Sequence, residues 1–180
     1  MRKKLLVVAL AIVVFAIGCA SLSNTPSGRV EEFLRRYQTT SDAVLIELGD
    51  FLDTLELDPE VREDYHAIYI RQYQDLEFEI QSENIDGNRA IVTVLIRVYD
   101  YYQANININN FIATNQNKFL DDEGQFSPTL AFKHRIEELS RVNNRVEHTI
   151  DFSLTRVNDE WTMDSLSEDI LEKIHGTFPY

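Results

Sequence analysis

The chain of 180 residues contains a single cysteine, and its basic residues are scarce, with 17 Lys and Arg against 30 Asp and Glu. One cysteine cannot form a framework of disulfides within the chain. The net charge of −13 repels phosphate backbones, so we expect no nucleic-acid partner. Repeats and long low-complexity tracts are also missing, which favours an ordinary globular domain.

Sequence motifs for cofactor chemistry are missing as well. We find no phosphate-binding loop, dinucleotide glycine motif, zinc-binding helix motif or nucleophile elbow. The stretch "DDEG" at residues 121–124 suggests calcium, but it lacks the alternating ligands and the closing bidentate glutamate of a calcium loop. A solvated acidic loop explains it better, and we expect neither a cofactor nor a metal site.

The one long apolar run lies at the start of the chain, at residues 5–17, after three basic residues at positions 2–4. As a helix it would span about 20 Å, short of a hydrocarbon core of about 30 Å. A basic segment before a short apolar one is typical of a secretory signal peptide. The alternative is an uncleaved anchor, because residues 5–22 carry no charge.

The only cysteine, Cys19, follows the small residues Ala16 and Gly18 where this apolar run ends. The arrangement resembles the bacterial lipobox, in which cleavage before the cysteine leaves it diacylated on sulfur at the mature N-terminus. Ala16 stands where that motif most often has leucine. Two or three acyl chains hold a protein at a membrane where one is marginal. We therefore expect cleavage between Gly18 and Cys19, and a protein anchored through Cys19 on the extracytoplasmic side of the cell membrane.

These features predict three parts: a signal peptide at residues 1–18, a lipidated cysteine with a flexible tether at 19–28, and a single domain at 29–180. Loop-forming residues fill the tether ("SLSNTPSG", 21–28). The mature chain would keep 14 basic and 30 acidic residues, a net charge of −16. Such a body does not adhere to anionic headgroups, so the acyl chains must hold it. About 150 residues suffice for one core.

Apolar spacing of i, i+3, i+4 and i+7 predicts three helices at the start of this domain. Ser41 is expected to cap the second helix and Asp58–Pro59 to open the third. Their apolar faces comprise Val30, Phe33, Leu34 and Tyr37 in the first; Leu45, Leu48, Phe51, Leu52 and Leu55 in the second; and Val61, Tyr65, Ile68 and Tyr69 in the third.

Alternation with a period of two then predicts strands. One hairpin runs over residues 76–102 and turns at "DGN" (86–88), and another runs over 146–163 and turns at "NDE" (158–160). Between them, residues 104–141 fit helices, although "NININN" has poor helix propensity. Ser167 and Gly176 bound a short final helix. The order predicts an α+β fold in which N-terminal helices pack on a bent antiparallel sheet with a helical insertion.

Three segments carry a resemblance to a known group of proteins: "YQDLEFEI" (73–80), "IDGNRAIVTVLIRVYDY" (85–101) and "EWTMDSLSEDILEKIHG" (160–176). They resemble small lipoproteins of Gram-positive bacteria with a cystatin-like or nuclear-transport-factor-like cone. The resemblance implies helices lying across a strongly bent sheet that encloses a pocket. It implies no activity, since its motifs are structural. The insertion at 104–141 is longer than a minimal cone needs.

His148 is the most interesting candidate for chemistry. Strand alternation places it on the buried face with Ile150 and Phe152, and places Asp100 on the buried face of the preceding hairpin. If both faced one concavity, the pair could act as a general base, with Asp100 orienting the imidazole. The simpler interpretation is a histidine satisfied within the core. His66, His134 and His175 fall on polar helix flanks and carry no signal.

Tyr99, Tyr101 and Tyr102 form the other candidate group, because each tyrosine offers a flat apolar body and a polar tip suited to an amphipathic pocket. Core packing is the alternative use. Two functions from different classes follow. The first is a lipid-anchored, non-enzymatic module that binds a small apolar ligand or an envelope protein. The second is a cone-fold lyase or isomerase that acts on a small apolar molecule through His148 and Asp100.

Overall fold

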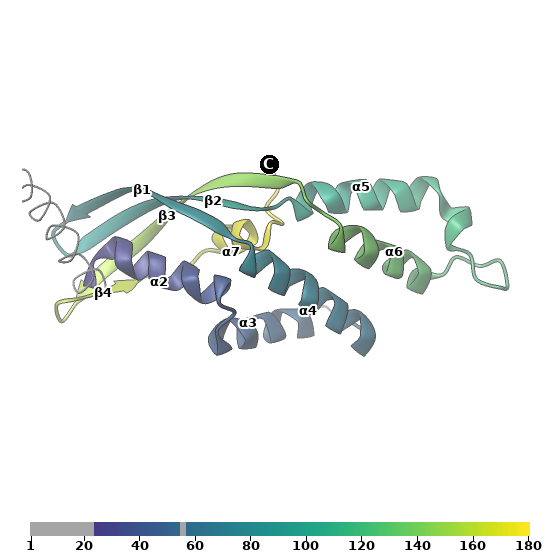
Figure 1. Cartoon of the computed structure of the whole chain (residues 1–180), viewed down its shortest axis with the longest axis horizontal. Coiled ribbons are helices and arrows are strands. Elements are labelled where there is room, and N and C mark those ends of the chain that lie inside the picture. The colour runs from purple at the N-terminus through teal and green to yellow at the C-terminus, as the bar shows by residue number, and fades with distance from the viewer. Residues whose placement is uncertain (1–23, 55–56) are drawn as a thin grey trace, which may run out of the picture.

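The computed structural model describes residues 24–54 and 57–180. Within these ranges, helices cover one face of a four-stranded antiparallel sheet, and α5 and α6 extend away from it to form the far end of an elongated molecule (Figure 1). The α+β class and the helical insertion are confirmed. The elements are α2 (Pro26–Gln38), α3 (Asp42–Asp53), α4 (Pro59–Gln74), β1 (Glu77–Asp86), β2 (Arg89–Tyr99), α5 (Tyr101–Thr114), the 3₁₀ helix η2 (Gln116–Phe119), α6 (Pro128–Ser140), β3 (Arg145–Val157), β4 (Glu160–Met163) and α7 (Glu168–His175).

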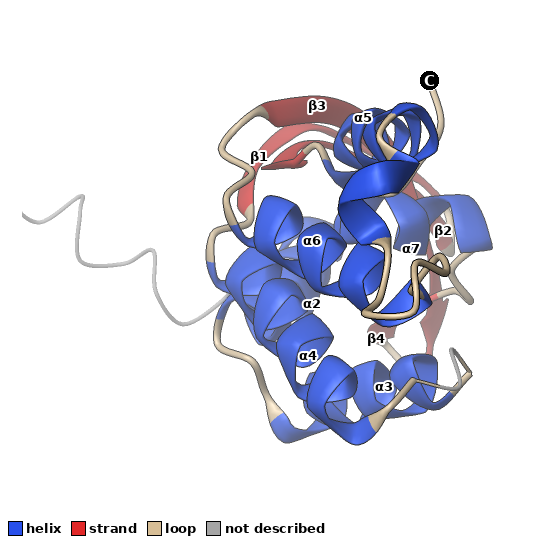
Figure 2. Ribbon diagram, turned by 90° about the vertical axis from the view of Figure 1, so that its right-hand side faces the viewer, coloured by secondary structure: helices blue, strands red, loops and turns tan. Residues whose placement is uncertain are grey.

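The sheet has the order β1-β2-β3-β4, and its inner face holds most of the core. Val94 lies opposite Ile150, and Val92 lies opposite Phe152. All four side chains are buried. Helices α2 and α7 pack against this face of the curled sheet (Figure 2). The apolar and polar residues alternate along the strands because one face of the sheet packs against helices and the other faces water.

Polar pairs dominate the outer face of the sheet. The guanidinium of Arg97 on β2 donates to Glu77 on β1 at 2.9 Å and to Glu147 on β3 at 2.5 Å. Both hairpin turns lie where the sequence predicts them, with Gly87 at φ 58° in the first and Asn158 at φ 50° in the second. Among the predicted helical residues, Leu55 lies outside the described residues.

The domain begins earlier than residue 29. The hydroxyl of Thr25 accepts the N–H of Gly28 and caps α2, whose first residue is Pro26. Proline at the first helical position after a capping threonine is a helix start, which the loop-like composition of this stretch concealed. Asn24 donates to the carbonyl of Asp159 at 3.0 Å, so this segment is fixed to the β3–β4 turn. Residues 24–28 therefore belong to the domain, and the expected tether shortens accordingly.

Helix α5 forms in spite of its asparagines. Asn105 donates to the carbonyl of Tyr101, one turn earlier, at 2.8 Å. From α6, the guanidinium of Arg135 donates to Asn105 at 2.7 Å and to Asn109 at 2.5 Å. The asparagine side chains thus join α5 to α6, and this tertiary pairing outweighs their low helix propensity.

Candidate functional site

A buried glutamine joins three elements of the fold just before α5 begins. Gln72 on α4 is 0% exposed, and its Oε1 accepts the N–H of Tyr99 at 2.9 Å while its Nε2 donates to the carbonyl of Ile174 at 3.2 Å. Both ends of the amide are therefore satisfied, as a buried polar group requires. This one side chain joins α4, the end of β2 and the end of α7.

Gly176 closes the same junction. It ends α7 at φ 73°, in the left-handed region, and its carbonyl accepts the N–H of Tyr102 at 2.8 Å. A Cβ at this position would overlap the carbonyl oxygen of Tyr99 and the side chain of Gln72. Glycine is thus required both by backbone conformation and by lack of space. The final helix is locked to the start of α5.

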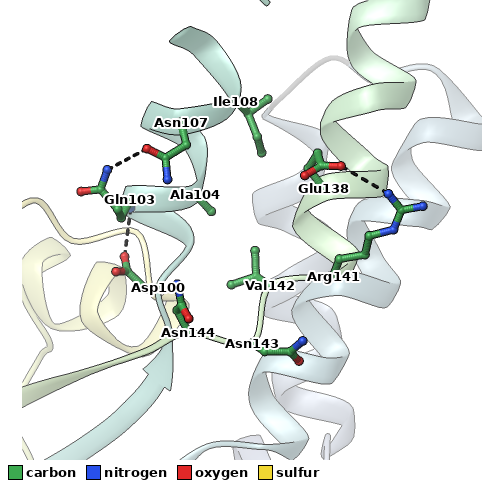
Figure 3. A pocket seen from close by; sticks show the side chains of 10 residues that line it. All are labelled: Asp100, Gln103, Ala104, Asn107, Ile108, Glu138, Arg141, Val142, Asn143 and Asn144. Atoms are coloured by element: carbon green, nitrogen blue, oxygen red, sulfur yellow. Dashed lines mark hydrogen bonds and ion pairs between the residues drawn. The ribbon is translucent and has the colours of Figure 1, made fainter. Parts of the chain in front are cut away.

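Beside this junction, the bases of α5 and α6 enclose an open cleft of about 340 Å³. Figure 3 shows the two helices as its walls, with Ala104 and Ile108 on one side and Val142 below the other. These three apolar residues form the floor of the cleft, and polar side chains surround them. The lining residues are Asp100, Gln103, Ala104, Asn107, Ile108, Glu138, Arg141, Val142, Asn143 and Asn144.

The polar groups of the cleft are mostly amides. Gln103 donates to Asn107 at 3.1 Å, and Arg141 donates to Glu138 at 3.3 Å across one turn of α6 (Figure 3). Within the part of the chain that the structure describes, no protein group bonds to the exposed side-chain amide of Asn144. Amides offer a donor and an acceptor on one side chain. The cleft can therefore bind a polar ligand through paired hydrogen bonds above an apolar floor.

His148 and Asp100 do not form a hydrogen bond with each other in the structure. Asp100 caps α5 by accepting the N–H of Gln103 at 2.9 Å, and it also accepts the hydroxyl of Tyr180 at 2.6 Å. The ring of His148 packs against those of Phe178 and Tyr180, with centroids 5.7 and 6.3 Å apart. Asp100 lines the cleft, whereas His148 does not. Their use as a catalytic pair stays a prediction.

Burial determines the protonation of His148. Its side chain is nearly buried, and within the described ranges its Nε2 has no hydrogen-bond partner. Desolvation lowers the pKa of His148, and the nearby ammonium of Lys173 lowers it further, while Asp100 acts in the opposite direction. The imidazole is therefore favoured in its neutral form, which fits a residue packed in a core.

The three candidate tyrosines pack at the junction and do not line the cleft. The Tyr99 hydroxyl donates to Asp75 at 2.7 Å, and its ring contacts the guanidiniums of Arg71 and Arg145 at 4.1 and 4.7 Å. Tyr101 stacks on Tyr99, with centroids 6.0 Å apart. The ring of Tyr102 lies 5.6 Å from that of Tyr180. These contacts are those of packing residues.

Sequence reasoning missed His175. The sequence pattern predicts a polar flank for it, but its ring lies among those of Phe51, Tyr69 and Tyr73, with centroids 5.5 to 5.7 Å away. Desolvation lowers its pKa to about 4. Helix α7 is covered by α4 as well as by the sheet, so the spacing of its own apolar residues could not show this contact.

The predicted cleavage site between Gly18 and Cys19, and with it the predicted lipidation of Cys19, lies outside the described residues. Across residues 24–54 and 57–180, no helix has the length and apolar character to cross a membrane. The same residues contain no cluster of His, Cys, Asp and Glu suited to a metal ion.

Comparisons with known proteins find similarity in structure but none in sequence. No family model matches the chain, and no curated protein matches it. Among solved structures, it is similar to a "putative lipoprotein (ycdA)" from Bacillus subtilis subsp. subtilis str. 168, with 12% sequence identity and a TM-score of 0.45. The match covers 76% of this chain and 45% of that protein, so the chain spans less than half of its length.

Proposed function

We propose that this protein is a lipoprotein anchored through acyl chains on Cys19 to the extracytoplasmic face of the cell membrane, and that its domain is a non-enzymatic binding module. The N-terminal pattern of basic, apolar and small residues before Cys19 supports the anchor. The cleft between α5 and α6 carries the binding part of the proposal. Its amide-rich wall favours a small polar ligand over the apolar one that the sequence suggested.

The start of the domain limits how far such a protein extends from its anchor. Five residue steps separate Cys19 from Asn24, a reach of at most about 18 Å when fully extended. Asn24 accepts the N–H of Trp161 and donates to the carbonyl of Asp159, so it is fixed to the β3–β4 turn. In a lipidated chain, the sheet end of the domain therefore lies next to the membrane.

A binding module accounts for the geometry better than a lyase or isomerase does. A general base must reach the proton that it removes. His148 is packed under Phe178 and does not line the cleft between α5 and α6, and the carboxylate of Asp100 is occupied by a helix cap and by Tyr180.

The anchor is tested in cells. Globomycin should cause the full precursor to accumulate, and Cys19→Ser should abolish labelling with a radioactive fatty acid and release the chain from membranes. A mature chain that still begins at Met1 and carries no acyl group would contradict the proposal.

The cleft is tested by native mass spectrometry of the protein extracted from its own membranes. We expect a co-purified small molecule on the wild type and its loss in Ala104→Trp, which fills the cleft. Ala113→Trp, at an exposed position of the same helix, is the matched control and should retain it. Both variants should give a folded circular dichroism spectrum. A ligand kept by Ala104→Trp would place the binding site elsewhere.

A further inference from the structure

Exposed apolar side chains concentrate at the free end of the helical insertion. The described residues include nine large apolar side chains that are exposed, and four of them fall within residues 111–130. We call these four the tip residues: Phe111 (37% exposed), Leu120 (41%), Phe126 (45%) and Leu130 (40%). Single exposed apolar residues are ordinary, but a local concentration marks an interaction surface.

An ordered turn presents these side chains. Leu120 and Phe126 pair in an antiparallel bridge, and Ser127 donates to the carbonyl of Phe119 at 2.6 Å. Phe119 itself is buried, with its ring 5.5 Å from that of His134. The backbone of the tip is thus held by its own hydrogen bonds and by a small aromatic cluster. Its exposed side chains need little further ordering when a partner binds.

The tip, between α5 and α6, lies at the opposite end of the molecule from the start of α2 (Figure 1). Strand β2 begins near the β3–β4 turn, where the N–H of Arg156 donates to the carbonyl of Asn88. From there β2 runs toward α5, which continues in the same general direction (Figure 1). Eleven residues of strand and fourteen of helix extend on the order of 55 Å. If the chain is anchored at Cys19, as proposed above, the tip is directed away from the membrane.

Charge at the tip indicates what binds there. Asp121, Asp122 and Glu123 join the two bridged residues, and none of the three forms an ion pair among the described residues. Of the lysines nearby, Lys118 lies over the ring of Phe111 at 4.8 Å. A second copy would bring two acidic loops together, and anionic headgroups would be repelled. A basic surface next to apolar side chains would be complementary.

We propose that the tip residues bind another protein on the extracytoplasmic side, through an apolar segment flanked by Lys or Arg. The tip inserts apolar side chains between the partner's own, while residues 121–123 pair with its cations. The direction of presentation rests on the proposed anchor; the binding surface does not.

Photo-cross-linking in the producing cells tests this inference. The full chain carries p-benzoylphenylalanine in place of Phe126, or in place of Ile46 on α3 as the control, since Ile46 is 65% exposed outside the tip. We expect a discrete protein adduct from position 126 only, and mass spectrometry should place the linked site in an apolar segment that contains Lys or Arg. The inference would be overturned by an adduct with a second copy of the chain, with lipid or with an acidic segment. The lack of any adduct would also overturn it.

Variants measure the contribution of each part of the surface. Leu120→Ser with Leu130→Ser should reduce the yield of the adduct at least tenfold, and Asp122→Asn with Glu123→Gln should reduce it several-fold. Ile46→Ser should leave it unchanged, and an adduct insensitive to the tip variants would also overturn the inference. Membrane fractionation of the same cells tests the proposed anchor separately. A chain that is membrane-bound but gives no adduct would therefore contradict the proposed tip surface and leave the anchor standing.

Discussion

The sheet half and the helical insertion of this protein are built from different amounts of core. In the sheet half, nineteen buried apolar residues form one cluster that includes β2, β3 and the helices against them. The second cluster, at the base of the insertion, contains five buried residues, three of which, Tyr101, Ile108 and Leu139, come from α5 and α6. Polar contacts supply much of the rest, such as those of Arg135 with two asparagines of α5 and of Arg71 with the carbonyl of Ser140 at 2.7 Å.

This difference separates stability from recognition. A large apolar core resists opening, whereas a segment with few buried apolar contacts opens at lower free energy. The cleft is lined mainly by the insertion, and the tip residues belong to it. Under the proposed function, the sheet half is the scaffold next to the anchor and the insertion carries the binding surfaces.

The largest effect is expected where the two halves join. Gly176→Ala should destabilise the protein by about 4 kcal/mol or more, because it adds an overlap with Tyr99 and Gln72 to the cost of a left-handed alanine. Gly87→Ala is the control: its φ is 58° but no atom lies within 4 Å of the added Cβ, so it should cost only about 1 kcal/mol. Urea denaturation measures both, and equal losses would show that the junction is not tightly packed.

The two cores should respond differently to truncation. Phe152→Ala removes a 0% exposed ring from the large cluster and should lower the free energy of global unfolding by about 3–5 kcal/mol. Ile108→Ala in the small cluster should cost about 2 kcal/mol and act mainly on α5 and α6. Urea midpoints with amide exchange of the same variants measure this. If Ile108→Ala loosened the sheet as much as the insertion, the two regions would be one unit.

A smaller effect, confined to the sheet half, should depend on pH. The pKa of His175 is lowered to about 4 in the folded chain, so between pH 6.5 and 4 the unfolded chain binds a proton that the folded chain does not. Stability should therefore fall as the pH falls through this range, by about 2 kcal/mol at pH 5. His175→Phe should remove this part of the pH dependence. A variant with the wild-type profile would show that His175 titrates freely.

Sequence reasoning succeeded where the signal was local. The period-two stripes of β2 and β3, the "DGN" turn and the helix bounded by Ser167 and Gly176 are all confirmed, because each depends on neighbours within a few residues. It also identified the burial of His148, since strand alternation alone decides that.

The rest depends on contacts between distant segments. Gln72 joins residues 27 and 102 positions away, and the aromatic surroundings of His175 come from α3 and α4. The cleft is lined by α5, by the end of α6 and by the residues that precede β3, none of which forms a motif. A single sequence does not show which polar faces meet.

Native-state hydrogen exchange of the full chain tests the division between scaffold and recognition most directly. With urea below the unfolding transition, mass spectrometry of proteolytic fragments gives an opening free energy for each segment. We predict that β2 and β3 exchange only through global unfolding, and that α5 and α6 exchange through an opening of lower free energy. One shared opening free energy for both regions, with the same dependence on urea, would contradict the account.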